Sequence, residues 1–154
     1  MTTSAAALRT ALAGLPAGAR LMGLDLGSKT IGVAVSDATR TIASPVETIA
    51  RRKFTADVTR LIELAGKNGV GLIVIGLPVN MDGSEGPRAQ STRAFVRNLA
   101  HFTPLPVVFW DERLSTAAVE RMMIEAYASR ARRAAAVDKL AAAWILQAAL
   151  DSLR

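Results

Sequence analysis

The sequence predicts an α/β protein built on a mixed β-sheet with helices on its faces. Three observations predict this class. Extended segments follow one another at the start of the chain, apolar strand-like runs alternate with helical stretches later, and 51% of the 154 residues are hydrophobic, enough for one packed core. We see no internal repeat. Residues 20–154 are therefore expected to form one domain behind an Ala-rich N-terminal extension, residues 1–19.

Five segments have the composition of strands, with β-branched and other apolar residues bounded by turn-forming residues. They cover residues 21–26, 30–36, 42–49, 71–77 and 106–110. A short turn around Lys29 joins the first two, which predicts a hairpin. Pro45 predicts that the third is an edge strand or contains a bulge, because proline cannot donate to a sheet ladder. The Leu-Ile-Val-Ile run of the fourth is typical of a parallel strand buried on both faces.

Helices are expected between and after these strands. Residues 54–67 repeat apolar side chains at helical spacing, and Asn68-Gly69 ends that helix. Three more helices are expected, at residues 89–101, 116–127 and 134–153, with a basic linker at residues 129–133 before the last. The extension is interpreted as a short helix or a loose segment. The resulting order is β-β-β-α-β-α-β-α-α, an antiparallel meander followed by helix–strand alternation.

Composition excludes several classes of protein. The chain has no cysteine, which rules out disulfides, thiolate zinc sites and cysteine nucleophiles and fits a reducing cytoplasm. No apolar run reaches the ~18 residues of a membrane span, so no membrane partner is expected. The single histidine, His101, has no Gly-x-Ser-x-Gly elbow to serve in a serine hydrolase. We interpret it as a surface residue at a helix end.

The net charge of +6 favours a polyanionic partner such as nucleic acid. Most of the basic residues are arginine, whose guanidinium makes bidentate contacts with phosphate. A bias toward alanine and arginine in the composition would explain the charge equally well. Charge alone therefore leaves the choice of partner open.

Carboxylates interrupt three apolar elements. Asp25 lies within the first strand, Asp111 and Glu112 follow the strand at 106–110, and Asp138 lies on the apolar stripe of the last helix. Strand alternation sends Asp111 and Glu112 to opposite faces, so one is expected in a site and the other beside an arginine or at a helix cap. Turn-starting and helix-capping aspartates are the ordinary alternative.

A buried charge requires a metal, a cation or a proton. If the three segments meet, they form an acidic cage of the kind that holds Mg²⁺ or Mn²⁺ for phosphodiester hydrolysis. Such a site needs no histidine base.

Three segments are candidates for phosphate contact. Residues 23–30 imitate a Walker A loop, but a strand pattern follows where a phosphate cradle needs a helix, so only Lys29 and its neighbours are expected to touch phosphate. The glycine-containing loop at residues 76–88 can offer backbone donors, with Arg88 behind it. Arg130, Arg132 and Arg133 precede Asp138 and either bind backbone phosphate or form a solvated charge run.

Four motifs in order cover most of residues 20–153. They are Gly-Leu-Asp-Leu-Gly-Ser-Lys-Thr-Ile-Gly-Val-Ala, Gly-Leu-Pro-Val-Asn-Met-Asp-Gly-Ser, Asp-Glu-Arg-Leu-Ser-Thr and Val-Asp-Lys-Leu-Ala-Ala-Ala-Trp-Ile-Leu-Gln. With them the chain closely resembles the YqgF family of pre-16S rRNA nucleases, once grouped with Holliday-junction resolvases.

The resemblance implies a ribonuclease H-like fold, a cytoplasmic location and a nuclease that matures the 5′ end of 16S rRNA. It also implies that Asp25, Glu112 and Asp138 are the catalytic and metal-binding set; choosing Glu112 over Asp111 follows the family pattern. Contacts with nucleic acid are expected from five basic residues, Lys29, Arg88, Arg113, Arg132 and Arg133.

Other functions remain open. The same chemistry could cut branched DNA, which needs paired symmetric cuts and hence a homodimer, whereas an RNA endonuclease could be a monomer. A non-catalytic RNA-binding assembly factor is a third hypothesis. Asp-x-Gly hairpins also begin actin-like ATPases, but those need two such domains around a nucleotide, more than 154 residues supply.

Overall fold

The computed structural model describes the backbone of residues 5–114 and 130–154, and the side chains of residues 5–113 and 140–154. Five strands form one sheet in the order β3-β2-β1-β4-β5. The strands are β1 (Arg20–Leu26), β2 (Thr30–Ser36), β3 (Ala43–Ala50), β4 (Val70–Leu77) and β5 (Val107–Asp111). The helices are α1 (Ala5–Ala13), α2 (Phe54–Lys67), α3 (Pro87–Leu99) and α5 (Arg130–Asp151), and a 3₁₀ turn, η1, spans Glu112–Leu114.

The sheet is mixed, as predicted. β2 pairs antiparallel with β1 and with β3, while β4 pairs parallel with β1 and with β5. β3 is an edge strand, and its register shifts where Ala34 pairs with Pro45. Both effects expected of Pro45 are therefore present. Since β1, β4 and β5 run in the same direction, their carboxyl ends meet at one edge of the sheet.

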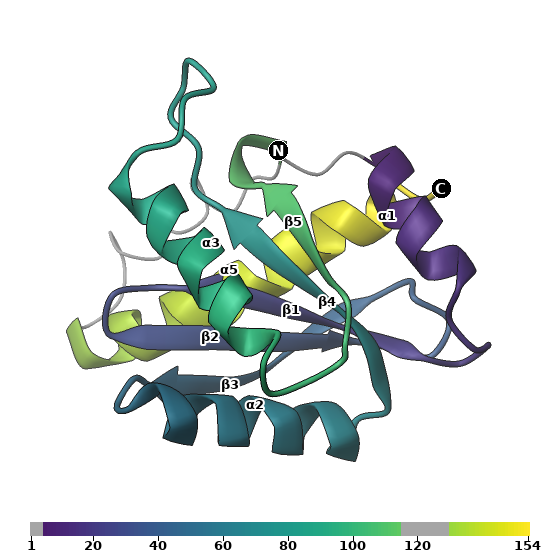
Figure 1. Cartoon of the computed structure of the whole chain (residues 1–154), viewed down its shortest axis with the longest axis horizontal. Helices are drawn as coiled ribbons and strands as arrows, with labels where there is room; N and C mark the ends of the chain where they lie inside the picture. The colour runs from purple at the N-terminus through teal and green to yellow at the C-terminus, as the bar shows by residue number, and fades with distance from the viewer. Residues whose placement is uncertain (1–4, 115–129) are drawn as a thin grey trace.

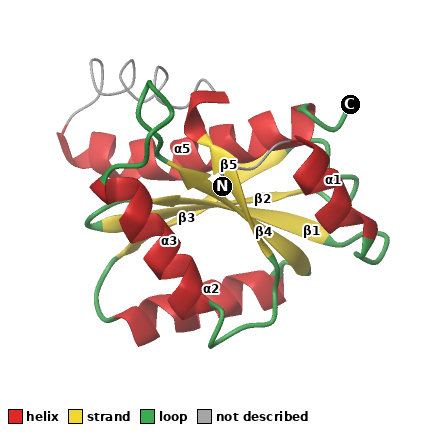
Figure 2. Ribbon diagram, turned by 45° about the horizontal axis from the view of Figure 1, so that its top comes forward, coloured by secondary structure: helices red, strands yellow, loops and turns green. Residues whose placement is uncertain are grey.

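Each face of the sheet carries its own hydrophobic cluster. Helices α2 and α3 cover one face (Figures 1 and 2), where residues such as Leu24, Ile75 and Phe95 are buried. Helices α1 and α5 cover the other, where Leu21, Val74 and Ile145 are buried. Strands β1 and β4 are buried on both faces, which explains their nearly continuous apolar sequences.

The predicted linker at residues 129–133 is wrong from Arg130 onward, because α5 already begins at that residue. Alanine and arginine are both good helix formers, so a basic Ala-rich segment continues a helix as readily as it forms a loop. Helix α3 begins at Pro87, two residues before the predicted start, since proline suits the first turn of a helix. The helix expected at residues 116–127 lies outside the described residues.

Helix α5 lies very close to β1. A Cβ on Gly23 would stand 2.7 Å from Leu146 Cβ and 3.0 Å from the carbonyl oxygen of Ala142. Only glycine allows a helix to approach a strand at that distance. In Figure 1, α5 crosses the sheet and begins on the same side of the molecule as the β1–β2 turn.

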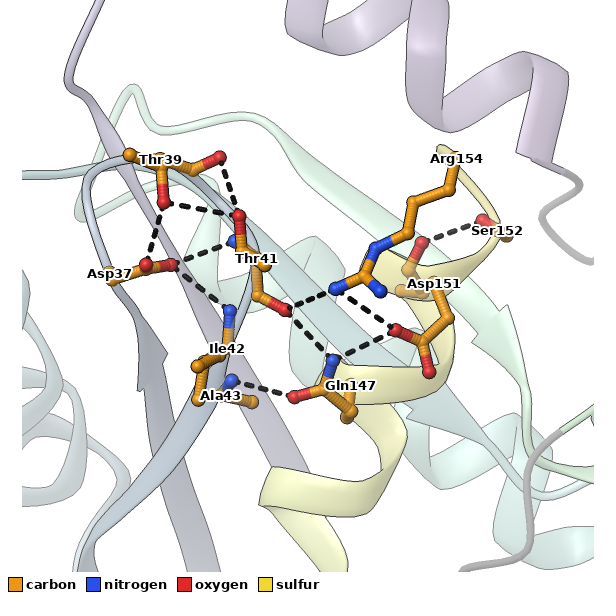
Figure 3. A network of polar contacts seen from close by, with 10 residues as sticks. Asp37, Thr39, Thr41, Ile42, Ala43, Gln147, Asp151, Ser152 and Arg154 are labelled. Atoms are coloured by element: carbon orange, nitrogen blue, oxygen red, sulfur yellow. Dashed lines mark hydrogen bonds and ion pairs between the residues drawn. The ribbon is translucent and has the colours of Figure 1, made fainter.

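Polar contacts fix the C-terminal half of α5 to the far end of the sheet (Figure 3). The side chain of Gln147 accepts from the Ala43 N–H at 2.8 Å and donates to the Thr41 carbonyl at 2.9 Å. Arg154 donates to the same carbonyl at 3.2 Å. These bonds set the height of α5 along β1, and so the height at which its N-terminal half crosses the carboxyl edge of the sheet. Among the described residues, no helix is both long and apolar enough for a membrane span.

Candidate active site

Asp25 is a buried carboxylate near the end of β1. It is 3% exposed and pairs with Gly32 across the hairpin. Alternation along β1 puts its side chain on the face of Gly23, which is the face that α5 covers. The carboxylate is therefore held at the carboxyl edge of the sheet, on the α5 side.

Glu112 reaches the same face from β5. A Cβ on Gly76 would lie 2.9 Å from Glu112 Oε1 and 3.1 Å from Glu112 Cγ, so the glutamate side chain covers Gly76. Leu24 of β1 pairs with Ile75 of β4, which makes Asp25 the neighbour of Gly76 on the adjacent strand. Asp25 and Glu112 therefore lie on the same face of the sheet, at its carboxyl edge, with β4 between their strands.

Asp138 lies in α5, four residues before Ala142. The Gln147 contact with Ala43 and the Ala142 contact with Gly23 show that α5 and β1 run in opposite directions. The four residues from Ala142 back to Asp138 span about 6 Å of helix, and the two from Gly23 to Asp25 span about 6.6 Å of strand. The backbone of Asp138 therefore lies beyond Gly23 in the direction of Asp25; its side chain lies outside the described residues.

Asp111 faces the opposite side and pairs with Arg113. The Arg113 side chain donates from Nη2 to Oδ2 at 2.7 Å and from Nε to Oδ1 at 3.1 Å, and the Arg113 N–H donates to Oδ1 at 2.9 Å. These bonds, chiefly those from the guanidinium, lower the pKa of Asp111. The predicted division between Asp111 and Glu112, one beside an arginine and one on the other face, matches this geometry.

A groove with basic residues in its lining lies at the same edge of the sheet, on the side of α3. It has a volume of about 630 Å³ between the β1–β2 turn and the start of α3. Lys29 and Arg88, both predicted to contact nucleic acid, line it from these two elements, with Ser28 and Ser91 between them.

Arg51 also lines the groove, although no sequence motif predicts it there. Its Nη1 donates to the Gly27 carbonyl at 2.6 Å, its N–H donates to the Lys29 carbonyl at 2.8 Å, and its guanidinium lies 5.9 Å from the centre of the Phe95 ring. An arginine after a strand is too common to mark a site. Only the pairing of β2 with β3 brings it to the turn.

Comparison with known proteins decides the family. The family described as "RuvX: Holliday junction resolvase" matches residues 19–152. The chain belongs to the RuvX family.

Two relatives of this RuvX chain carry the name "Putative pre-16S rRNA nuclease". The one from Rhodobacter capsulatus is 62% identical over 92% of this chain and 89% of its own length. The one from Methylocella silvestris is 62% identical over 88% of this chain and 84% of its own length.

The fold also matches a solved structure, T. thermophilus RuvC in complex with a Holliday junction substrate. The TM-score is 0.53 at 13% identity, over 82% of this chain and 91% of that one. The RuvX chain therefore has the predicted ribonuclease H-like fold.

The acidic edge of the RuvX chain suits a hard divalent cation. Asp25 and Glu112 offer carboxylate oxygens from the ends of β1 and β5, the strands on either side of β4, and oxygen is the ligand type that Mg²⁺ and Mn²⁺ prefer. Among the residues with described side chains, no group of three acidic or histidine residues comes together. A third ligand would have to come from the α5 segment that contains Asp138.

The remaining basic candidates differ in their surroundings. Arg113 is occupied by Asp111 and by the Met81 carbonyl, to which its Nη1 donates at 3.3 Å. Arg132 and Arg133 lie in the first turn of α5, with side chains outside the described residues.

Proposed function

We propose that this protein is a metal-dependent endonuclease that hydrolyses phosphodiester bonds of structured RNA during 5′-end maturation of pre-16S rRNA. The observation that supports the proposal is the position of Asp25 and Glu112 on one face of the sheet, at its carboxyl edge, toward which the N-terminal half of α5 carries Asp138. The names of the relatives supply the substrate. Precursor rRNA is a cytoplasmic substrate in bacteria, and we propose the cytoplasm as the location.

In this proposal Asp25, Glu112 and Asp138 hold Mg²⁺ or Mn²⁺ with their carboxylate oxygens. Divalent ions in such sites lower the pKa of a bound water and stabilise the leaving oxygen. The chain's own contribution is to fix the oxygens. Asp25 is held by the hairpin, Glu112 is seated on Gly76, and Asp138 is carried by a helix anchored at its other end.

Substrate phosphates would follow the groove lined by Lys29, Arg51 and Arg88. Arginine and lysine position a nucleic-acid backbone without reading its sequence. Arg132 and Arg133 stand at the start of the helix that carries Asp138 and would bind phosphate on the other side of the cut. Arg113 would act by holding the loop before α3, since Asp111 and Met81 already engage its guanidinium.

A second candidate function is resolution of branched DNA, which the description of the matching family favours. Resolution of a four-way junction requires two symmetric cuts, so it predicts a homodimer, whereas a monomer suffices for the RNA cut. A strictly monomeric active enzyme would count against this alternative.

The test compares wild type, Asp25→Asn and Asp138→Asn on precursor 16S rRNA and on four-way junction DNA, with Mg²⁺, with Mn²⁺ and with chelator. We expect wild type to cut the RNA in a metal-dependent way and both variants to lose the activity. Glu63→Gln is the matched control, because Glu63 is an exposed acid on α2. Full cleavage by both variants would end the proposal. Metal-independent RNA binding without any cleavage would identify an assembly factor instead.

A further inference from the structure

The loop between β4 and α3, residues 78–86, presents an apolar side chain to solvent. Met81 is 91% exposed. The other large apolar residues exposed in the described part of the chain, Ile42, Ile62 and Phe102, are 59%, 39% and 48% exposed. Figure 1 shows this loop projecting beyond the carboxyl edge of the sheet. A methionine this exposed does not contribute the hydrophobic stabilisation that burial of its side chain would give.

This exposure is fixed by the loop's own bonds. The Asn80 N–H donates to the Ser84 carbonyl at 2.9 Å, and the Gly83 N–H donates to the Asn80 carbonyl at 2.8 Å. Ser84 donates to Asp82 Oδ1 from its hydroxyl at 2.6 Å and from its N–H at 2.9 Å. Gly83 has a φ of +90°, which favours glycine. The turn therefore holds Met81 outward.

The loop is held at two points by arginines from neighbouring elements. Arg113 follows Glu112 directly and donates to the Met81 carbonyl at 3.3 Å. At the other end, Arg93 Nη2 of α3 donates to Glu85 Oε2 at 2.7 Å. Pro87 and Arg88 then begin α3 and line the basic groove. Met81 thus stands on a braced turn beyond the carboxyl edge of the sheet, in the loop that leads into α3 and the basic groove.

We propose that Met81 packs against an unpaired base of the substrate next to the cleaved bond, which makes it a residue that selects single-stranded or distorted sites. This inference rests on the proposed nuclease function. A thioether is polarizable and packs well on π-systems. Because every base has a π-face, such a contact selects an unstacked base without selecting sequence. A duplex keeps its bases stacked and offers Met81 no such face.

The experiment compares wild type, Met81→Ala and Met81→Leu on two RNAs with the same cleavage sequence. In one RNA the nucleotides beside the cut are unpaired, and in the other a complementary strand pairs them. Because the lost contact is with one unstacked base, we expect Met81→Ala to lower affinity and cleavage of the unpaired RNA about tenfold. The same variant should leave affinity and cleavage of the paired RNA within about twofold of wild type, since stacked bases make no such contact.

Four controls separate this role from a structural one. Met81→Leu keeps an apolar contact and should recover most of the activity. The Tm of Met81→Ala should equal that of wild type, because the side chain is exposed. 2-Aminopurine placed beside the cut should change its fluorescence on binding to wild type but not to Met81→Ala, and Ile62→Ala should behave as wild type.

The outcomes distinguish the two proposals. If wild type cleaves RNA and Met81→Ala cleaves both RNAs as fast as wild type does, the role of Met81 is refuted and the nuclease remains. An equal loss on both RNAs also refutes base packing, because it indicates a change in the loop. If wild type neither binds nor cleaves RNA, the nuclease proposal fails and the role of Met81 fails with it.

Discussion

Gly76 lies directly beneath the carboxylate of Glu112. A Cβ at this position would stand 2.9 Å from Glu112 Oε1 and 2.7 Å from Ile145 Cδ1 of α5. One missing methyl group therefore makes room both for the glutamate and for the helix that carries Asp138. The spacing of the proposed acidic set depends on this glycine.

Gly76→Ala is expected to displace Glu112 and α5 together. Overpacking of this kind costs about 1–3 kcal/mol of stability, and cleavage should fall at least about tenfold because catalytic groups tolerate little displacement. Thermal unfolding and cleavage rates measure both effects. Gly66→Ala is the control: Gly66 is exposed in α2 and its added Cβ meets nothing within 4 Å, so that variant should be stabilised by about 0.5–1 kcal/mol. Wild-type cleavage by Gly76→Ala would contradict the seating of Glu112.

Amide substitutions at Asp111 and Glu112 should have opposite consequences. Glu112→Gln removes a proposed metal ligand, so cleavage should fall on the order of 100-fold with little change in unfolding temperature. Asp111→Asn removes the negative charge that holds Arg113. Because Asp111 is only 4% exposed, this variant should lose about 1–2 kcal/mol of stability. Its loss of cleavage should be smaller than that of Glu112→Gln. Thermal unfolding and cleavage rates of both variants show which carboxylate serves catalysis and which serves stability. The reverse ranking would make Asp111 the ligand.

Lys29→Gln and Arg88→Gln should each weaken RNA binding in a salt-dependent way. Each phosphate contact contributes about 0.7 to the slope of log K against log salt for single strands. Each variant should therefore lower the slope by about that amount, and the double variant by about twice as much. Arg97→Gln provides the control. Arg97 is exposed on α3, and the nine residues that separate it from Arg88 place it on the opposite side of the helix. An unchanged slope in the double variant would remove the groove from the substrate path.

Asp37 should contribute stability that disappears in acid. Its carboxylate accepts from the Thr39 hydroxyl at 2.7 Å and from the N–H groups of Thr41 and Ile42 (Figure 3), and these bonds, that from Thr39 first, lower its pKa from 3.8 to about 2. A carboxyl with a lowered pKa stabilises the fold above its ordinary pKa and loses this effect as pH falls through the lowered value.

Asp37→Asn should therefore lower the Tm near neutral pH. The difference from wild type should persist down to about pH 4 and shrink as the pH falls toward about 2. Thermal unfolding across this range checks the expectation, with Asp151→Asn as a comparison on an exposed acid at the end of α5. A difference that stays constant at every pH would show that Asp37 acts through something other than its charge.

Local pattern accounts for most of the elements and for their faces. β2 and α2 have the predicted bounds, and β1, β4 and β5 begin or end within one residue of expectation. Period-2 alternation is enough to send the side chains of Asp111 and Glu112 to opposite faces. The linker predicted ahead of α5 is wrong because a run of charge does not by itself indicate a loop. Helix propensity depends instead on backbone and side-chain entropy.

The sequence by itself determined a mixed α/β sheet, the chemistry of its carboxylates and the strands and helix that carry them, because these follow from residue type and local period. Only the tertiary structure decided that Glu112 rests on Gly76, that α5 touches β1 at Gly23, and that Arg51 joins Lys29 in the groove. The physical reason is separation along the chain. Such contacts join residues far apart in sequence, and strand pairing and close packing fix them, neither of which leaves a local pattern.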